Sequence, residues 1–277
     1  MKRLRTRRLE IPALPREVGI IKVYSDMLRW LIDQTKRYFE RHTPTGNEIW
    51  QRLESTTIII LAIPNGWELP QQHRLREATI QAGVLPRGFG EDRLKFVTEG
   101  ESSIHYALQH INDPHWLREG AMFALTDAGG STVDSTLYTC TKTAPDLQLE
   151  EARGSECVQA GSIFVDRAMR TLLERRLAGS RFGNTRDISE MCKDFGCFVK
   201  RQFGDERDEY SISFGSFRDN DQQFGISRGR LRLSRDEIEQ AFSGVVTAIE
   251  ESCSELLLNR EAKASFLSGV DQREFKH

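Results

Sequence analysis

The stretch from Met122 to Cys140 constrains the fold most, because an apolar run and an alternating run flank a double glycine. Met122 to Thr126 predicts a buried strand, which ends at Asp127-Ala128-Gly129-Gly130. Ser131 to Cys140 alternates between apolar and polar side chains, as an antiparallel partner strand does. We therefore predict a β-hairpin whose turn is centred on residues 127–134.

Strands and helices are predicted on both sides of this hairpin. Thr57 to Ile63 is continuously apolar and β-branched, which favours a central strand buried on both faces, and Arg93 to Val97 predicts a shorter strand. Stripes of apolar residues at helical spacing predict helices over about residues 20–41, 71–82, 99–111, 161–177 and 235–256. The region from about 180 to 232 is irregular and charged. The order of elements predicts an α/β or α+β sheet protein.

Composition favours an ordinary cytoplasmic protein. The 39 Lys and Arg nearly balance the 41 Asp and Glu, so we expect neither nucleic acid nor an acidic membrane surface as a partner. No apolar run reaches the ~20 residues of a membrane helix. The five cysteines are an odd number, and no Asn-x-Ser/Thr acceptor occurs. Cys192 and Cys197 lack the second ligand pair that a zinc site needs, so no metal is assigned to cysteine.

The hairpin turn is the main candidate for chemistry. Successive backbone N–H groups of a glycine turn can point one way and form an anion nest, to which Ser131 and Thr132 add hydroxyl donors. Asp127 could hold Mg²⁺ through water. The alternative is a plain hairpin, because Gly-Gly turns are common.

Glu99 is a second candidate, because it follows a strand and opens a helix whose positive end attracts phosphate. Either it caps that helix, or it orients water or metal if its strand lies beside that of Asp127. Known phosphate-loop, dinucleotide, nucleophile-elbow and zinc-protease motifs are absent from the sequence, and the six histidines are scattered.

The run Asp127-Ala128-Gly129-Gly130-Ser131-Thr132-Val133-Asp134 resembles the second phosphate motif of the 70-kilodalton heat-shock proteins, with Ser131 in place of the third glycine. Three further segments look like that family and follow in the same order. They are Ile63 to Trp67, Phe96 to Glu101 and Val158 to Arg167. The resemblance covers about residues 20–258.

This resemblance implies an actin-like ATPase (ribonuclease H-like) fold, in which two lobes clamp Mg-ATP. Residues 20–126 would form the remainder of the first lobe, and residues 127–258 the second lobe. Asp127 and Glu99 would organise Mg²⁺ and the attacking water. The β- and γ-phosphates would be contacted by Gly129, Gly130, Ser131 and Thr132. Gly161 and Ser162 would approach the nucleotide from the other lobe.

The sequence departs from the family pattern at both ends. The first phosphate motif and its lysine should precede residue 20, where a basic tail, residues 1–19, stands instead. The adenosine-binding strand should follow residue 258, where residues 259–277 diverge. The domain is therefore expected to be incomplete, truncated at both ends, and at most a weak ATPase. Loss of the first hairpin should also expose an apolar sheet edge near Thr57 to Ile63 to a covering partner.

Two alternatives to an ATP-binding protein stay open. One is a non-catalytic interaction protein that keeps the actin-like fold. The other is a relative of sugar or acetate kinases, which shares the glycine hairpin but should carry a substrate acid that the sequence does not reveal.

Overall fold

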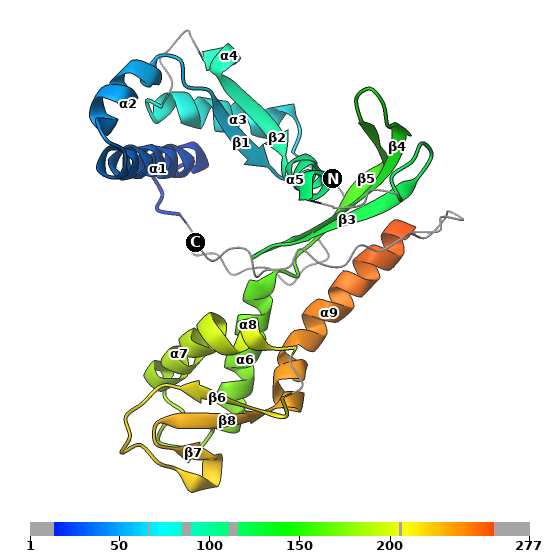
Figure 1. Ribbon diagram of the computed structural model, residues 1–277. Coiled ribbons are helices and arrows are strands. Elements are labelled where there is room, and N and C mark those ends of the chain that lie inside the picture. Colours follow the sequence, from blue (N-terminus) through cyan, green and yellow to red (C-terminus); the bar gives the residue numbers. More distant parts are fainter. Residues whose placement is uncertain (1–13, 66, 85–89, 111–115, 205–206, 258–277) are drawn as a thin grey trace. The chain divides into compact units, whose positions relative to one another are not determined.

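A computed structural model describes residues 14–65, 67–84, 90–110, 116–204 and 207–257 (Figure 1). The predicted tail 259–277 lies outside these residues, as does most of the predicted tail 1–19. Contacts divide the chain into two compact units, up to Arg118 and from Glu119 onward, whereas the sequence predicts a boundary at residue 127. Helices and strands occur in both units, so the predicted mixed α/β class is confirmed.

The first unit contains two parallel strands and several helices. Strand β1 pairs with β2 in register from Ile59 opposite Leu94 to Ile63 opposite Thr98. The elements are α1 (Ile20–His42), α2 (Gly46–Glu54), β1 (Ile59–Ile63), α3 (Leu69–Gln81), α4 (Gly90–Arg93), β2 (Leu94–Thr98) and α5 (Glu99–His110). Among these, α2 was not predicted, because its few apolar residues form too short a stripe.

Helix α1 packs along α3, and one of its side chains also caps the C-terminus of α3. Arg29 of α1 donates from Nε to the Ala82 carbonyl at 3.0 Å and from Nη2 to the Gln81 carbonyl at 2.8 Å. These carbonyls are among the groups that a helix leaves unsatisfied at its C-terminus, where a cation is also favoured. The two helices are therefore joined by charge-assisted hydrogen bonds as well as by packing.

The prediction that the first strand is buried on both faces is wrong. Ile63 is buried, but Ile58 and Ile60 are 58 % and 65 % exposed. Within the described residues β1 pairs with β2 alone. Continuous apolar runs are typical of strands covered on both sides. Here nothing among the described residues covers the side of the strand on which Ile60 lies.

The second unit begins with an antiparallel sheet in the order β3-β4-β5 and continues with a small sheet in the order β6-β8-β7. Its elements include β3 (Met122–Ala128), β4 (Val133–Lys142), β5 (Gln148–Val158), α6 (Ser162–Arg176), α7 (Thr185–Asp194), a π-helical turn (Phe195–Val199), α8 (Lys200–Gln202), β6 (Glu209–Ser213), β7 (Ile226–Ser227), β8 (Arg230–Ser234) and α9 (Arg235–Leu257). The predicted strand at Met122 to Thr126 forms, but of these five residues only Phe123 is fully buried.

The main core of the second unit lies among α6, α7, the π-helical turn, the small sheet and α9 (Figure 1). Met169 and Leu173 of α6, Phe195, and Ile212 of β6 are fully buried. The predicted stripe on residues 161–177 supplies the face of α6 that fills this core. Burial of such large side chains is the dominant favourable contribution to folding.

A reciprocal capping box between Ser234 and Glu237 fixes the start of α9, the helix predicted over about residues 235–256. The Glu237 amide donates to Ser234 Oγ at 3.3 Å, and the Ser234 amide donates to Glu237 Oε2 at 2.8 Å. Arg176, the last residue of α6, donates to both carboxylate oxygens of Glu237 at 2.7 and 2.8 Å. The end of α6 is therefore tied to the start of α9. None of the helices in the described ranges is long and apolar enough to cross a membrane.

Candidate functional site

The predicted hairpin forms between β3 and β4. Asp127 lies opposite Asp134, and Ala128 lies opposite Val133. The turn is closed by a hydrogen bond of 3.0 Å from the Gly129 amide to the Thr132 carbonyl. The antiparallel hairpin across the double glycine is therefore confirmed.

The first turn of α6 docks directly onto this hairpin turn. The amides of Gly161, Ser162 and Ile163 donate to the carbonyls of Ser131, Gly129 and Gly130 at 3.2, 3.0 and 3.0 Å. A helix leaves its first N–H groups without partners, and here the hairpin carbonyls accept from them. These amides are thus occupied by the protein itself. Gly161 and Ser162, predicted to face a nucleotide from the other lobe, lie in the same unit as the hairpin.

Ile163 belongs to this contact and was not singled out from the sequence. Its amide is the second inside α6, because Gly161 is the N-cap residue. The only signal for it was positional: any residue at that place in a helix has an amide without an intrahelical partner. Side-chain chemistry gave no indication, because an isoleucine contributes here through its backbone.

The two glycines at this contact differ in what they require. A Cβ on Gly161 would lie 2.4 Å from the carbonyl carbon of Gly130, so no side chain fits there. A Cβ on Gly130 would meet nothing within 4 Å, and the φ of Gly130 is outside the left-handed range. The protein therefore needs glycine at 161 for its own packing but leaves open space above residue 130.

Three consecutive amides of the turn remain available. Within the described residues, the N–H groups of Gly130, Ser131 and Thr132 have no acceptor. Gly130 and Ser131 are exposed, and Thr132 is half-buried. The hydroxyls of Ser131 and Thr132 also make no hydrogen bond there. Adjacent free donors at an exposed turn are the chemistry of an anion site.

Asp127 and Asp134 place two carboxylates beside this turn. Directly opposite residues of an antiparallel pair project on the same face, so the two side chains are cross-strand neighbours. Both are half-buried. A hydrated hard cation would reduce the repulsion between the two carboxylates. Holding Mg²⁺ through water is the role predicted for Asp127. In the part of the chain that the structure describes, no three or more His, Cys, Asp or Glu residues gather as a metal cluster.

Glu99 lies in the first unit, at the start of α5. The Glu101 amide donates to Thr98 Oγ1 at 3.1 Å, and the Gly100 amide donates to Asn65 Oδ1 at 2.8 Å. The first amides of α5 thus have side-chain acceptors. The structure describes Glu99 and Asp127 in separate units, so their pairing stays a prediction.

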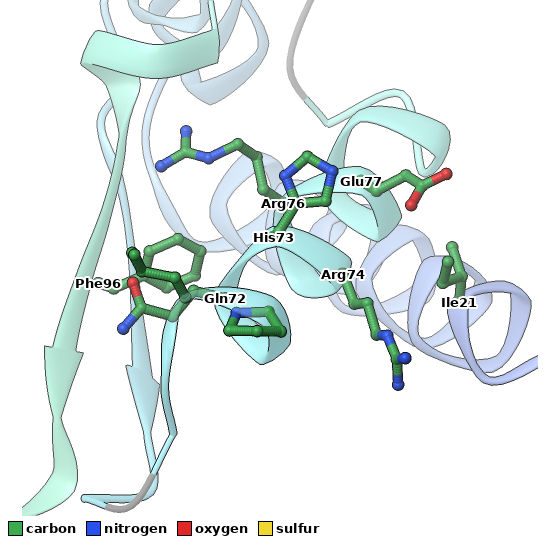
Figure 2. Close-up of a pocket in the computed structure, with 9 residues that line it drawn as sticks. Ile21, Gln72, His73, Arg74, Arg76, Glu77 and Phe96 are labelled. Atoms are coloured by element: carbon green, nitrogen blue, oxygen red, sulfur yellow. The ribbon is translucent and has the colours of Figure 1, made fainter.

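The first unit also contains a surface cavity of 660 Å³ between α1, α3 and β2. In Figure 2, Ile21 lies on α1 and Phe96 lies on β2. Arg74 and Gln72 belong to α3, with Arg74 on the side of α1 and Gln72 on the side of β2. The Arg76 guanidinium lies 5.4 Å from the Phe96 ring centre. None of the residues predicted for the nucleotide site lines this cavity.

No protein-family model matches the sequence, and no curated protein matches it. Among solved structures, the chain is similar to one described as a pCBH ParM non-polymerisable quadruple mutant, with 15 % sequence identity and a TM-score of 0.46. The match covers 72 % of this chain and 52 % of that protein, so the chain spans about half the length of that structure.

Proposed function

We propose that the chain binds the phosphate groups of a nucleotide, ATP or ADP with Mg²⁺, at the turn from Gly129 to Thr132. The supporting observation is the row of three amides, Gly130 to Thr132, that have no acceptor among the described residues. Charge-assisted hydrogen bonds from such donors contribute roughly 1.5 to 3 kcal/mol each. The open space above Gly130 supports the proposal further, because a phosphate could approach the backbone there.

The acidic residues of the hairpin fit a hydrated Mg²⁺. Asp127 would hold the ion through water, and Asp134 would add a second carboxylate on the same face of the hairpin. When bound, Mg²⁺ neutralises phosphate charge. The turn amides orient the phosphate oxygens, and the α6 contact holds the turn in place.

Titration calorimetry with Mg-ATP tests this proposal. The wild-type chain is expected to bind with a Kd below about 100 μM, which corresponds to ~5.5 kcal/mol. Gly130→Asp should abolish the heat, because its carboxylate would stand among the phosphate donors. Gly154→Asp is the matched control, since a Cβ on Gly154 of β5 also meets nothing within 4 Å. Absence of wild-type heat, or equal heat from Gly130→Asp, would contradict the proposal.

Two further measurements extend this experiment, the first to adenosine binding and the second to hydrolysis. A parallel titration with Mg-triphosphate separates phosphate binding from adenosine binding. Glu99 is the proposed residue for orienting the attacking water, so Glu99→Gln should remove phosphate release while leaving the Kd for Mg-ATP within about twofold. If Glu99→Gln releases phosphate as fast as the wild type, Glu99 has no such role.

Protein interaction is a second candidate function, favoured by the outer face of α1. Ile20, Val23, Met27 and Trp30 are 46, 37, 57 and 60 % exposed. Their spacing of three, four and three residues is the pattern of a coiled-coil seam, which is self-complementary. Exposed apolar side chains also occur at β1, near the predicted bare edge, and form a separate candidate contact surface. We propose that a second copy of the chain covers the α1 seam.

Sedimentation equilibrium tests this second proposal. The wild type should dimerise at protein concentrations of about 100 μM or less. Met27→Glu with Trp30→Glu should give monomers, because the charges would be buried in the seam. Phe198→Glu is the control, since Phe198 is 59 % exposed in the second unit. A monomeric wild type, or a double variant that still dimerises, would rule the seam out.

A further inference from the structure

The outer face of the small sheet carries three arginines in close succession. Alternation along β8 places Leu231 in the core with no exposure, while Arg230 and Arg232 point to solvent. Arg228 belongs to the turn that joins β7 to β8. We call Arg228, Arg230 and Arg232 the arginine face. They line a surface cavity of 510 Å³ together with Ser211, Ser227 and Phe217.

The arginine face has no acidic partner in the described part of the chain. None of its three guanidinium groups forms an ion pair there. Arg176, in contrast, is paired with Glu237. Cationic groups close together repel one another unless an anion lies between them, so this face is electrostatically unsatisfied.

Arg228 adopts a backbone conformation that arginine rarely takes. Ser227 pairs with Arg230, so Arg228 and Gly229 form a two-residue turn with φ of 52° and 70°. Positive φ at both positions defines a type I′ turn, for which Asn-Gly is strongly preferred. A long side chain in the left-handed region is uncommon and often marks a functional position.

Neighbouring groups hold Arg228 in this conformation. Its amide donates to Asn220 Oδ1 at 2.9 Å, and its guanidinium lies 4.6 Å from the ring centre of Phe217. Phe217 is itself 71 % exposed. A guanidinium over an aromatic ring is held by a cation–π interaction, which leaves its N–H groups able to donate to an incoming anion.

We propose that the arginine face binds an extended acidic segment of a partner protein. Arg230 and Arg232 are two strand residues apart, about 6.7 Å along the strand, which is also the repeat of alternate side chains in an extended peptide. Carboxylates at alternate positions of the segment would each meet one guanidinium, which binds carboxylate bidentately. The hydroxyls of Ser211 and Ser227 and the exposed Phe217 ring offer further contacts.

A protein segment fits this face better than nucleic acid does. Nucleic-acid binding depends on an extended positive surface. Here the formal net charge of the chain is -2. Glu209 also projects on the same face of β6 as Ser211, so the positive surface is bounded at that end. A short acidic peptide needs only the three arginines.

Fluorescence anisotropy with the full chain tests the proposal. The probe is a labelled nine-residue peptide with glutamate at alternate positions, and the reference peptide has glutamine in those places. The glutamate peptide should bind at least about tenfold more tightly than the glutamine peptide. Arg230→Gln with Arg232→Gln should remove this preference. Arg186→Gln with Arg201→Gln, which changes two exposed arginines elsewhere in the unit, should keep it within about twofold.

Arg228→Asn separates binding from folding. Asparagine suits the first position of a type I′ turn, so the melting temperature should not fall, yet peptide affinity should weaken at least about threefold. Three results would overturn the proposal: no preference for the glutamate peptide, equal affinities for the two double variants, or binding of a labelled thymidine oligonucleotide without binding of the peptide. The last result would identify a nucleic-acid surface instead.

Discussion

Gly161 approaches Gly130 so closely that a Cβ on Gly161 would lie 2.4 Å from the carbonyl carbon of Gly130. The reverse does not hold, because a Cβ on Gly130 meets open space. The two glycines therefore have different roles. Gly161 allows the close contact between α6 and the hairpin, and Gly130 leaves open space above the turn.

Gly161→Ala should therefore destabilise the protein by about 1 to 3 kcal/mol, because the hairpin and α6 must separate to admit the methyl group. Gly130→Ala should change the free energy of unfolding by less than about 0.5 kcal/mol. Denaturant unfolding of the two variants measures the difference. Equal destabilisation would mean that the docking of α6 onto the turn is not as tight as described.

Glu237→Ala should destabilise the second unit by about 2 kcal/mol, because the change removes an N-terminal cap of α9 and the partner of Arg176. Glu239→Ala is the control. Glu239 accepts one hydrogen bond of 2.8 Å from Arg235 on the exposed side of the same helix. Its removal should cost less than about 0.5 kcal/mol by denaturant unfolding. Similar losses would show that the capping box adds little.

Cys192 should react slowly with iodoacetamide at neutral pH. Burial raises the pKa of its thiol, and the nearby Arg170 opposes this shift without cancelling it. The thiolate is the reactive form, so the alkylation rate of Cys192 should rise only at a pH above that needed for an ordinary thiol. Exposed Cys157 and Cys197 provide the internal comparison. Peptide mapping by mass spectrometry that finds Cys192 labelled first would contradict this prediction.

Asp219 should make the loop at residues 215–219 sensitive to acid. Hydrogen bonds from the Ser216 hydroxyl and amide, each 2.7 Å, lower the pKa of the Asp219 carboxyl. A lowered pKa in the folded state gives stability that is present above the unfolded pKa of about 3.9 and is lost as pH falls toward the folded value.

Asp219→Asn should accordingly melt at a lower temperature than the wild type at pH 7, and the gap should narrow as the pH falls below about 4. Calorimetric melting of both proteins across this range measures the gap. A gap that stays constant with pH would show that the stabilisation does not depend on ionised Asp219.

The regular elements of the fold were predictable where side-chain periodicity was strong. Helix α6 and the hairpin of β3 and β4 follow from the apolar stripe at residues 161–177 and from the glycine turn. Strand β5 was missed, because its residues are largely polar and its irregular pairing with β4 obscures the alternation. Helix α7 was missed within a region dominated by charged and polar residues, where propensity alone is a weak guide.

The candidate site was predictable only in part. The sequence identified the turn residues, because an acid followed by two glycines limits what a backbone can do. The family resemblance implied that Gly161 approaches the nucleotide from the other lobe, and that role stays a prediction; the resemblance did not predict that the Gly161 amide donates to the Ser131 carbonyl of the hairpin. Such a contact depends on which backbone groups meet across the tertiary fold, and side-chain identity does not encode that directly.

The docking of α6 onto the turn makes the helix a lever. Three hydrogen bonds join the turn to one end of a 15-residue rod, so neither part can shift without the other. At 1.5 Å per residue, the far end of this rod is about 22 Å away, where Arg176 grips the first turn of α9. The hairpin turn and the first turn of α9 therefore contact opposite ends of one helix, so a rigid-body shift of α6 would change both contacts together.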